Sequence, residues 1–600
     1  MKLWPALIAL VLAVSTGATS PVDAACTIVK LAELPVTMDG FIPLVPAKVN
    51  GVDALFEFDS GFFWSSVTPA GAMLFGLKPD ATSRTVSGAG GNERQRLSTA
   101  RDIVFHGITY PKPIFLLSHR NLGGNAMGLL GQNALGAADV EYDLANGVVR
   151  LTGALECKDA VLAYWRKPGQ AWSSIDIDRT DPDRPHIIGS ATLNGKRIRV
   201  MFDTGAARSI LSMEAAARAG VRPDYAGVSS AGFTVGIAAN SKVTTWIAPF
   251  ASFKLGDEEI KNTKLRFGDV RFHNGGNLDQ VDLVLGVDFF LSHRIYVAKS
   301  QHKLYFTYNG GTVFRLDDVP QQSTAAPPGD SAAPASTDSN SDSPTDAAGF
   351  ARRAAASEAR RNSAAALADL TRAVALEPTS PEYVLKRGLL QLWIGHRDEA
   401  RVDFDAALKL QPDNIPALEA RADLNITKGN LTQVRLDLDA ADRAAVKDPA
   451  ARWQIASYYE RAGMPAPAIG EYDQWIAARP NDPLMPGALY RRCQLRAMWN
   501  LDLPLALADC NAALKSYPRD RSTLASRGLV YLRMGDYDNA LSDYNDALRF
   551  GEDSPWTLYG RGVARLRKGR AAEGNADLQA VAARWPHFAD EAKARGQTLP

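Results

Sequence analysis

The sequence predicts a multidomain fold, with two all-β lobes in tandem followed by an all-α superhelix of repeats. Short β-branched and aromatic runs, broken by Gly, Asn-Gly and Pro, fill the first half and are typical of small all-β units. That half also contains a duplication, with blocks of similar sequence repeated in the same order, whereas the second half has helical periodicity with a repeat of about 34 residues. A chain of 600 residues is long enough for several such units, each with its own core.

Two ordered blocks of similar sequence define the lobes, which we place at residues 27–157 and 170–315. Residues 47–51 match 191–195, and the same offset carries Phe58-Asp59-Ser60-Gly61 onto Phe202-Asp203-Thr204-Gly205. Further on, Leu130-Gly131 matches Leu285-Gly286. The Asn-Gly in both copies predicts a hairpin turn feeding an apolar strand that ends at the aspartate.

The first 24 residues have the layout of a secretory signal peptide. Lys2 is followed by an apolar run to Val14 and by small residues before a cleavage point near Ala24. The apolar run is too short to span a bilayer comfortably, so we expect no stable membrane span and a periplasmic or secreted location. A membrane anchor, or lipid attachment at Cys26, is the alternative.

Charge and cysteine content narrow the function classes. The net charge of +1 leaves no basic excess for phosphates, so we expect no nucleic-acid partner. Four cysteines fit an oxidising compartment, and Cys26 and Cys157, which flank the first lobe, could tie its ends by a disulfide. Four buried free thiols are the alternative. No cysteine pair has zinc-finger spacing and no HExxH motif occurs, so we expect no metal and no cofactor.

A Pro-, Ser-, Ala- and Asp-rich segment at residues 317–348 predicts a flexible linker, because it cannot bury enough apolar surface to offset its ordering entropy. After it, residues 349–590 repeat small and aromatic residues at fixed places. The clearest unit has Gly528, Tyr531, Gly535, Ala540, Tyr544 and Ala547. This pattern resembles a tetratricopeptide repeat (TPR) array of about seven units.

The tetratricopeptide resemblance implies stacked helix pairs whose concave face binds a protein partner. A structural spacer is the alternative. In the unit at residues 488–518, Cys493 takes the small-residue place and Cys510 the aromatic place. Those two positions face each other in such repeats, which implies a second disulfide.

An Asp-Ser-Gly or Asp-Thr-Gly tripeptide ends an apolar strand in each lobe and is followed downstream by a hydrophobic-hydrophobic-Gly segment. This resembles the retropepsin-like and pepsin-like aspartic proteases over residues 27–315. The resemblance implies that two loops meet at a pseudo-twofold axis with Asp59 and Asp203 as the catalytic pair. Like charges a few Å apart cannot both ionise, so one carboxylate would activate a water while the other donates a proton to the peptide carbonyl.

The same resemblance assigns supporting residues. It implies that Ser60 and Thr204 hydrogen-bond across the axis, and that Gly61 and Gly205 let the backbone approach the carboxylates where a Cβ would clash. It also implies flaps, hairpins that close over the substrate, in the glycine-containing stretches with Gly88, Gly90, Gly232 and Gly236. Ordinary mobile hairpins are the alternative there.

These features predict an exported aspartic endopeptidase that acts on peptides or proteins, monomeric, with its lobes paired within one chain. Three alternatives stay open. The aspartates could be plain turn residues. Phe62-Phe63-Trp64, where the family has a small residue, could crowd the cleft and leave a non-catalytic peptide-binding scaffold. Each lobe could also pair with its twin in another chain.

Overall fold

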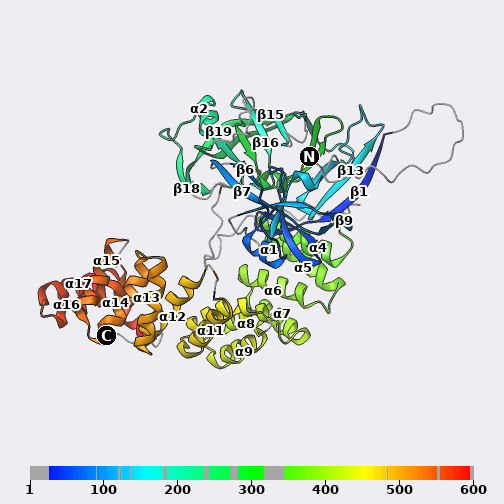
Figure 1. Ribbon diagram of the computed structural model, residues 1–600. Helices are drawn as coiled ribbons and strands as arrows, with labels where there is room; N and C mark the ends of the chain where they lie inside the picture. The colour runs from blue at the N-terminus through cyan, green and yellow to red at the C-terminus, as the bar shows by residue number, and fades with distance from the viewer. Residues whose placement is uncertain are drawn as a thin grey trace, which may run out of the picture. The chain divides into compact units, whose positions relative to one another are not determined.

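The computed structural model describes residues 26–88, 91–118, 122, 125–135, 138–179, 186–235, 242–270, 281–316, 344–446, 448–480, 482, 484–550 and 554–594. The predicted signal peptide, Gly90, Gly236 and most of the predicted linker (317–343) lie outside these residues. The chain divides into two compact units, Met1–Pro378 and Thr379–Pro600 (Figure 1).

Strands dominate the first unit, as predicted. The first lobe contains β1 (Thr27–Pro35), β2 (Thr37–Asp39), β3 (Ile42–Val49), β4 (Val52–Phe58), β5 (Ser66–Val67), α1 (Pro69–Leu74), β6 (Ser83–Gly88), β7 (Gly91–Thr99), β8 (Asp102–Phe105), β9 (Ile108–Pro111), β10 (Ile114–Leu117), β11 (Gly128–Leu130), η1 (Gln132–Ala134), β12 (Asp139–Asp143), η2 (Leu144–Asn146) and β13 (Val148–Leu155). The second lobe contains β14 (Ser173–Asp176), β15 (Ile188–Leu193), β16 (Lys196–Phe202), β17 (Ile210–Ser212), α2 (Met213–Arg218), β18 (Ser229–Val235), β19 (Lys242–Leu255), β20 (Glu258–Gly268), β21 (Leu283–Leu285), α3 (Val287–Ser292), β22 (His293–Ala298) and β23 (Lys303–Tyr308).

Each lobe has a sheet of its own, and a shared sheet joins the two lobes. The shared sheet has the strand order β1-β13-β12-β22-β23-β14. At its centre β12 of the first lobe pairs antiparallel with β22 of the second, with Val140 opposite Val297 and Tyr142 opposite Ile295. One buried apolar cluster runs through both lobes, from Leu34 to Phe314. The lobes therefore lie against each other within one chain.

The two Asn-Gly dipeptides form the predicted hairpin turns. Asn50 and Gly51 have φ of 53° and 87°, and Asn194 and Gly195 have φ of 48° and 74°. Positive φ at both central positions is the requirement of a type I′ turn, which Asn and Gly meet at low cost. The turns join β3 to β4 and β15 to β16, and each of β4 and β16 ends directly before its aspartate.

A helix pair packs on the lobes. Helix α4 (Ala347–Ala359) contacts β2 and η2, and α5 (Ser363–Leu376) packs on α4 (Figure 1). Ala356 and Ala359 are buried in the same apolar cluster as the strands, and the Arg315 side chain donates to the backbone carbonyl of Arg360. This first helix pair therefore belongs to the same compact unit as the lobes.

The second unit is helical. It contains α6 (Pro381–Trp393), α7 (Arg397–Leu410), α8 (Ile415–Thr427), α9 (Leu431–Ala444), η3 (Pro449–Ala451), α10 (Arg452–Arg461), α11 (Pro465–Ala478), α12 (Met485–Trp499), α13 (Leu503–Ser516), α14 (Arg521–Met534), α15 (Tyr537–Arg549), α16 (Pro555–Arg567), α17 (Ala571–Arg584) and α18 (Phe588–Ala594). Consecutive helices from α6 to α17 pack in pairs, and each pair packs on the next. The predicted helical repeat array is confirmed.

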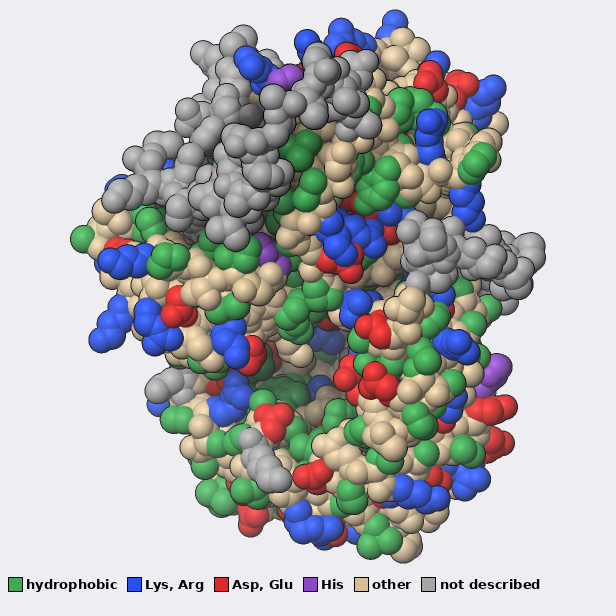
Figure 2. Space-filling view, turned by 90° about the vertical axis from the view of Figure 1, so that its right-hand side faces the viewer, with side chains coloured by type: hydrophobic (Ala, Val, Ile, Leu, Met, Phe, Trp, Pro, Cys, Tyr) green, Lys and Arg blue, Asp and Glu red, His purple; other side chains and the backbone are tan. Residues whose placement is uncertain are grey.

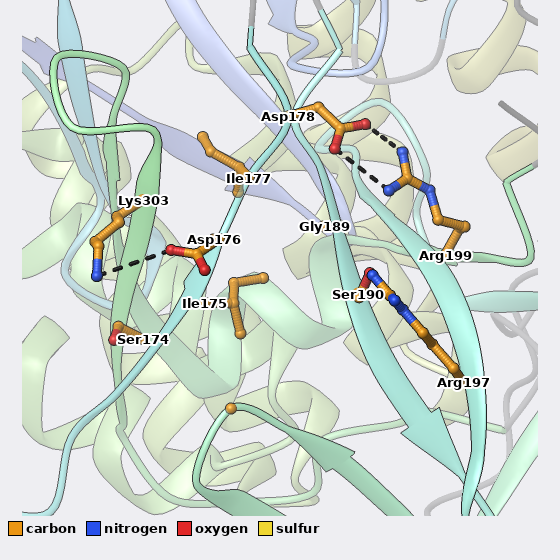
Figure 3. Close-up of a pocket in the computed structure, with 11 residues that line it drawn as sticks. Ser174, Ile175, Asp176, Ile177, Asp178, Gly189, Ser190, Arg197, Arg199 and Lys303 are labelled. Atoms are coloured by element: carbon orange, nitrogen blue, oxygen red, sulfur yellow. Dashed lines mark hydrogen bonds and ion pairs between the residues drawn. The ribbon is translucent and has the colours of Figure 1, made fainter. Parts of the chain in front are cut away.

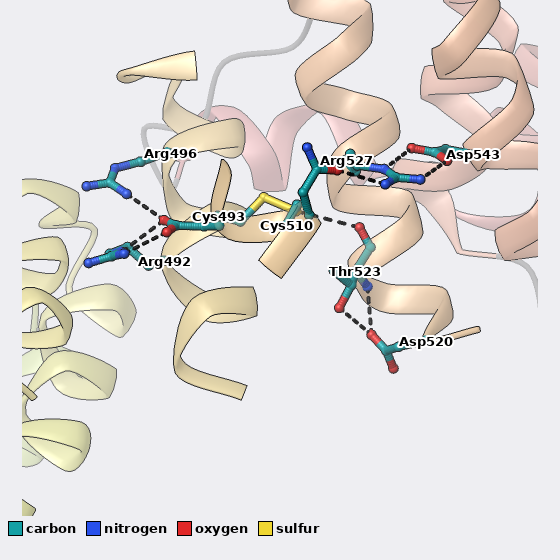
Figure 4. Close-up of a disulfide and its surroundings, with 10 residues drawn as sticks. Arg492, Cys493, Arg496, Cys510, Asp520, Thr523, Arg527 and Asp543 are labelled. Carbon is teal, nitrogen blue, oxygen red and sulfur yellow. Dashed lines mark hydrogen bonds and ion pairs between the residues drawn. A yellow bond between two sulfur atoms is a disulfide. The ribbon is translucent and has the colours of Figure 1, made fainter. Parts of the chain in front are cut away.

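The small and aromatic repeat positions fit together as expected. A Cβ on Gly528 would lie 3.0 Å from the ring of Tyr544, and one on Gly388 would lie 2.8 Å from the ring of Phe404. In the pair α12–α13 the same two places are taken by cysteines, and Cys493 and Cys510 form the predicted disulfide (Figure 4). The Cys26–Cys157 disulfide is also present, so both pairings are confirmed.

An arginine–aspartate ion pair recurs along the array and was not foreseen from the sequence. The arginine precedes the small residue of the first helix, and both oxygens of an aspartate on the second helix accept from it. The pairs are Arg353–Asp369, Arg387–Asp403, Arg421–Asp437, Arg492–Asp509, Arg527–Asp543 and Arg561–Asp577. Such two-bond pairs fix the two helices of a repeat in register.

Removing only the arginine of one ion pair is expected to destabilise the array. Asp403 is 3% exposed and accepts from Arg387 at 2.8 and 2.7 Å. R387A would leave this carboxylate buried without its partner, so we expect a loss of about 2–3 kcal/mol in the free energy of unfolding. Urea unfolding followed by circular dichroism at the helical band measures it. The double variant R387A/D403A should lose less, and a loss as large as in R387A would contradict this account.

Candidate active site

Equivalent strands hold the two aspartate-bearing loops in equivalent ways. Asp59 follows β4, which pairs in parallel with β11, and its backbone N–H donates to the carbonyl of Leu130 at 3.0 Å. Asp203 follows β16, which pairs in parallel with β21, and its N–H donates to the carbonyl of Leu285 at 3.0 Å. The hydrophobic-hydrophobic-Gly segments thus support the ends of the aspartate-bearing strands.

The loops are bonded crosswise between the lobes. The backbone N–H of Ser60 donates to Thr204 Oγ1 at 2.9 Å, and the N–H of Thr204 donates to Ser60 Oγ at 2.9 Å. Each hydroxyl in turn donates across the axis, Thr204 to the carbonyl of Phe58 at 2.6 Å and Ser60 to that of Phe202 at 3.1 Å. Both hydroxyls are fully buried, so these bonds hold the two loops in one arrangement.

The two carboxyl groups lie next to each other and against the opposite loop. A Cβ on Gly61 would lie 2.1–2.5 Å from the carboxyl atoms of Asp203, and one on Gly205 would lie 2.4–2.6 Å from those of Asp59. Each carboxylate also accepts from the glycine N–H of its own loop at 2.8 Å. The structure therefore brings together Asp59, Asp203 and both glycines.

Adding a methyl group at Gly61 is expected to separate the carboxyls. The Cβ of G61A would overlap the Asp203 carboxyl, so the carboxyl or the loop must shift. Misplacement on the scale of 1 Å costs on the order of 100-fold in rate, which should appear in kcat/KM for any peptide that the protein cleaves. G153A is the matched control because nothing lies within 4 Å of that position. Wild-type rates in G61A would contradict the geometry.

Behind the loops a second set of bonds repeats in both lobes. Asn133 Oδ1 accepts from the N–H and the hydroxyl of Ser65 at 3.0 and 2.8 Å, while Asp288 Oδ1 accepts from those of Ser209 at 2.9 and 2.7 Å. The first lobe has an additional bond, from Gln132 Nε2 to the carbonyl of Ser60 at 2.7 Å. Ser65 corresponds to Ser209, and Asn133 to Asp288, in the duplicated sequence, so the duplication could have revealed them.

The dyad is electrostatically asymmetric. Asp59 is only 6% exposed, whereas Asp203 is partly open to solvent. Burial, followed by the charges of Asp203 and Glu57, raises the pKa of Asp59 well above its ordinary range. Burial also raises the pKa of Asp203, but a hydrogen bond from Asp59, the backbone N–H groups of Gly205 and Ala206 and the charge of His186 act in the opposite direction. The pair therefore favours one shared proton.

Two further titratable side chains beside the dyad were missed by the sequence analysis. Glu57 lies two residues before Asp59 on β4, and burial together with the charge of Asp203 raises its pKa to about 7. Strand alternation puts Glu57 on the same face as Asp59, a signal that could have found it. His186, just before β15, lies opposite Asp203 in the register of β15 with β16. No motif marks it in the sequence.

The aromatic run after Gly61 packs around the loop. The carbonyls of Phe62 and Phe63 accept from the N–H groups of Gln132 and Asn133, both at 2.9 Å. Trp64 meets Phe63 edge to face at a centroid distance of 5.0 Å. These contacts hold the run against the Leu-Gly segment, and the Asp59 carboxyl still faces Gly205.

The stretches expected to form flaps belong to hairpins. Gly88 ends β6, which pairs with β7, and Arg84 on β6 lies 4.4 Å over the ring of Trp64. Gly232, with φ of 70°, lies where β18 shifts register against β19. These are the described members of the predicted flaps, and their movement over a substrate stays a prediction.

A separate hollow of about 420 Å³ lies in the second lobe between β14, β15 and β16 (Figure 3). Its charged side chains pair locally, Asp178 with Arg199 and Asp176 with Lys303. It contains neither dyad aspartate.

On the face seen in Figure 2, basic and acidic side chains are interspersed. Within the described residues no group of His, Cys, Asp and Glu could hold a metal ion, and no helix is long and apolar enough to cross a membrane.

Comparison with known proteins gives two family matches. The aspartyl protease family model matches residues 45–134 and 189–289, one segment in each lobe, and a tetratricopeptide repeat model matches residues 522–550. No curated protein matches the chain.

Solved structures similar to the chain include a tetratricopeptide repeat protein from Parabacteroides merdae, 17% identical, covering 41% of this chain and 97% of that one with a TM-score of 0.32. Another is YrrB, described as a TPR protein with an unusual peptide-binding site, 16% identical over 32% of this chain and 97% of that one with a TM-score of 0.28. From the family matches and the fold together, the chain consists of two aspartyl-protease-like lobes joined to a tetratricopeptide repeat array.

Proposed function

We propose that this protein is an aspartic endopeptidase in which Asp59 and Asp203 together activate a water molecule for peptide-bond hydrolysis. The ionised carboxylate removes a proton from the water, and the protonated carboxyl donates to the carbonyl oxygen of the peptide. The water oxygen bonds to the carbonyl carbon. The carboxyl that took the water proton then gives it to the amide nitrogen, the C–N bond breaks, and the other carboxylate takes back a hydroxyl proton as the new carboxyl group forms. No covalent link to the enzyme forms.

One observation carries this proposal. The loops of the two lobes are bonded crosswise by Ser60 and Thr204, and this places each carboxyl against the glycine of the opposite loop. A turn role for the aspartates needs only bonds within one loop. The crossed arrangement supports a joint role for the two carboxyls, and their raised pKa values support a shared proton in the acidic range.

The test is an activity assay on the mature full-length protein. We expect cleavage of a peptide library with an acidic optimum, and inhibition by a statine-type compound, whose hydroxyl occupies the place of the attacking water. Tight peptide binding without cleavage between mildly acidic and neutral pH would favour a peptide-binding scaffold instead. A monomer mass in solution would support pairing of the lobes within one chain.

The helical array is proposed to bind a protein partner or the substrate on its concave face, as tetratricopeptide arrays commonly do. Export to the periplasm or beyond is proposed from the predicted signal peptide, and the two disulfides are consistent with an oxidising compartment. Detection of the mature N-terminus in the periplasmic fraction checks this. Recovery of the full-length chain only from the cytoplasm would contradict it.

A further inference from the structure

The surroundings of the two aspartates differ between the lobes, although their loops are alike. At the offset that superposes Asp59 on Asp203, His186 of the second lobe corresponds to Ile42 of the first. At the same offset Glu57 corresponds to Met201. The copy around Asp203 therefore carries a histidine, and the copy around Asp59 carries a glutamate. A difference of this kind can decide where a shared proton resides.

The pairing of β15 with β16 places His186 beside Asp203. Gly61 lies against the Asp203 carboxyl, so closely that its Cβ would lie 2.1 Å from Cγ. The antiparallel register pairs Ile188 with Met201, and the N–H of Phe202 donates to the carbonyl of Ile187 at 3.0 Å, so the next residues in register, His186 and Asp203, lie opposite each other. The Nδ1 of His186 is buried and makes no hydrogen bond within the described residues. The imidazole thus lies beside Asp203, whose carboxyl in turn lies against Gly61 of the first lobe.

We propose that His186 is a positioning residue that keeps Asp203 ionised, so that the shared proton resides on Asp59. This inference rests on the proposed function and assigns a separate role to each of its two carboxyls. Asp203 is then the general base that takes a proton from the water. Asp59 is the acid that donates to the peptide carbonyl.

Burial of the two carboxyls agrees with this division. Asp59, at 6% exposed, is the costlier place for a charge, and Asp203 is the more open of the two. The other titratable groups near Asp59 are Glu57 on β4 and Tyr142 on β12, and the loop after Asp203 carries Arg208, whose guanidinium lies 5.8 Å over the Phe41 ring. Neither Glu57 nor Tyr142 supplies a positive charge to Asp59.

The charges of His186 and Glu57 at acidic pH fit the same assignment of the proton to Asp59. Burial lowers the pKa of His186, while the charge of Asp203 and the backbone of Gly61 oppose that shift, so the imidazole gains its charge as the pH falls. The pKa of Glu57 is about 7, so Glu57 is neutral there. A cation beside Asp203 and no second anion beside Asp59 favour a single negative charge, located on Asp203.

The first experiment needs no catalysis. The imidazole signals of the full-length protein, labelled with ¹³C at histidine Cε1, are titrated by NMR, and H186Q assigns the His186 signal. D203N should move the His186 midpoint to lower pH, because it removes the neighbouring charge. D59N should leave that midpoint unchanged, because it removes a neutral carboxyl. Equal shifts in both variants, or a larger shift in D59N, would overturn the proposal.

The second experiment is the pH profile of kcat/KM. H186Q keeps a polar side chain of similar size but loses the charge, so the acidic limb should move to higher pH while the melting temperature stays near that of wild type. H587Q, at an exposed histidine of the array, is the matched control. A full loss of stability with an unmoved acidic limb would mean a structural role only. If the wild type cleaves nothing, the proposed function fails, and the NMR titration still decides where the charge resides.

Discussion

Replacing Asp59 or Asp203 by asparagine is expected to lower kcat/KM by at least about 100-fold, the effect typical of losing a general acid or base. Either change leaves a neutral amide where one carboxyl of the pair stood. The partner then lacks the group with which it shares a proton, so the water loses either its base or the acid that completes the step. Single-turnover cleavage of a fluorogenic peptide measures the loss.

The same variants should not lose stability. Both carboxyls have a pKa raised in the folded protein, so the folded state holds protons that the unfolded chain releases. These bound protons stabilise the folded state below the pKa that the carboxyls have in the unfolded chain. That stabilisation is lost as the pH rises through the pKa that they have in the folded protein. D59N should therefore melt higher than wild type at neutral pH, and the difference should vanish in strong acid. A lower melting temperature at neutral pH would contradict this reasoning.

A carboxylate outside the dyad provides the control for both measurements. The side chain of Asp176 is 88% exposed and lies in the separate hollow of the second lobe (Figure 3). D176N should retain wild-type activity and stability. Retained cleavage in D59N or D203N, at the level of D176N, would sink the catalytic assignment.

Removing the disulfide of the repeat array is expected to cost about 3 kcal/mol of unfolding free energy. Cys493 and Cys510 are separated by 17 residues, and crosslinking a loop of this size restricts the unfolded chain by about that amount in the chain-entropy description. Both cysteines are fully buried between α12 and α13, so the C493A/C510A variant also leaves unfilled space (Figure 4). Urea unfolding followed at the helical band measures the loss.

A second variant separates the crosslink from the packing. Other repeats place glycine and an aromatic residue at these positions, as in Gly528 against Tyr544. The C493G/C510Y variant should therefore regain part of the stability lost in C493A/C510A. No recovery would mean that the crosslink alone stabilises this repeat. Equal stability of wild type and C493A/C510A without reductant would contradict the prediction.

Much of the fold was determined by local sequence patterns. Asn50-Gly51 and Asn194-Gly195 predicted the two hairpins because only a few residues tolerate positive φ at low cost. The repeat of small and aromatic residues predicted the helix pairs, and two cysteines at facing positions predicted the second disulfide. Each of these signals lies within a short stretch or recurs at a fixed spacing, so the sequence carries it directly.

What the tertiary structure decided depends on contacts between distant segments. The duplicated aspartates could be recognised in the sequence, but the distance between their carboxyls depends on hydrogen bonds between Ser60 and Thr204, which lie 144 residues apart in the chain. His186 has no motif, and it lies opposite Asp203 because β15 and β16 pair in that register, while the packing of the lobes adds Gly61 beside the Asp203 carboxyl. Charge and burial around a carboxyl are properties of that assembled neighbourhood. Sequence spacing alone therefore identified the pair, and only the packed lobes could assign its two members different roles.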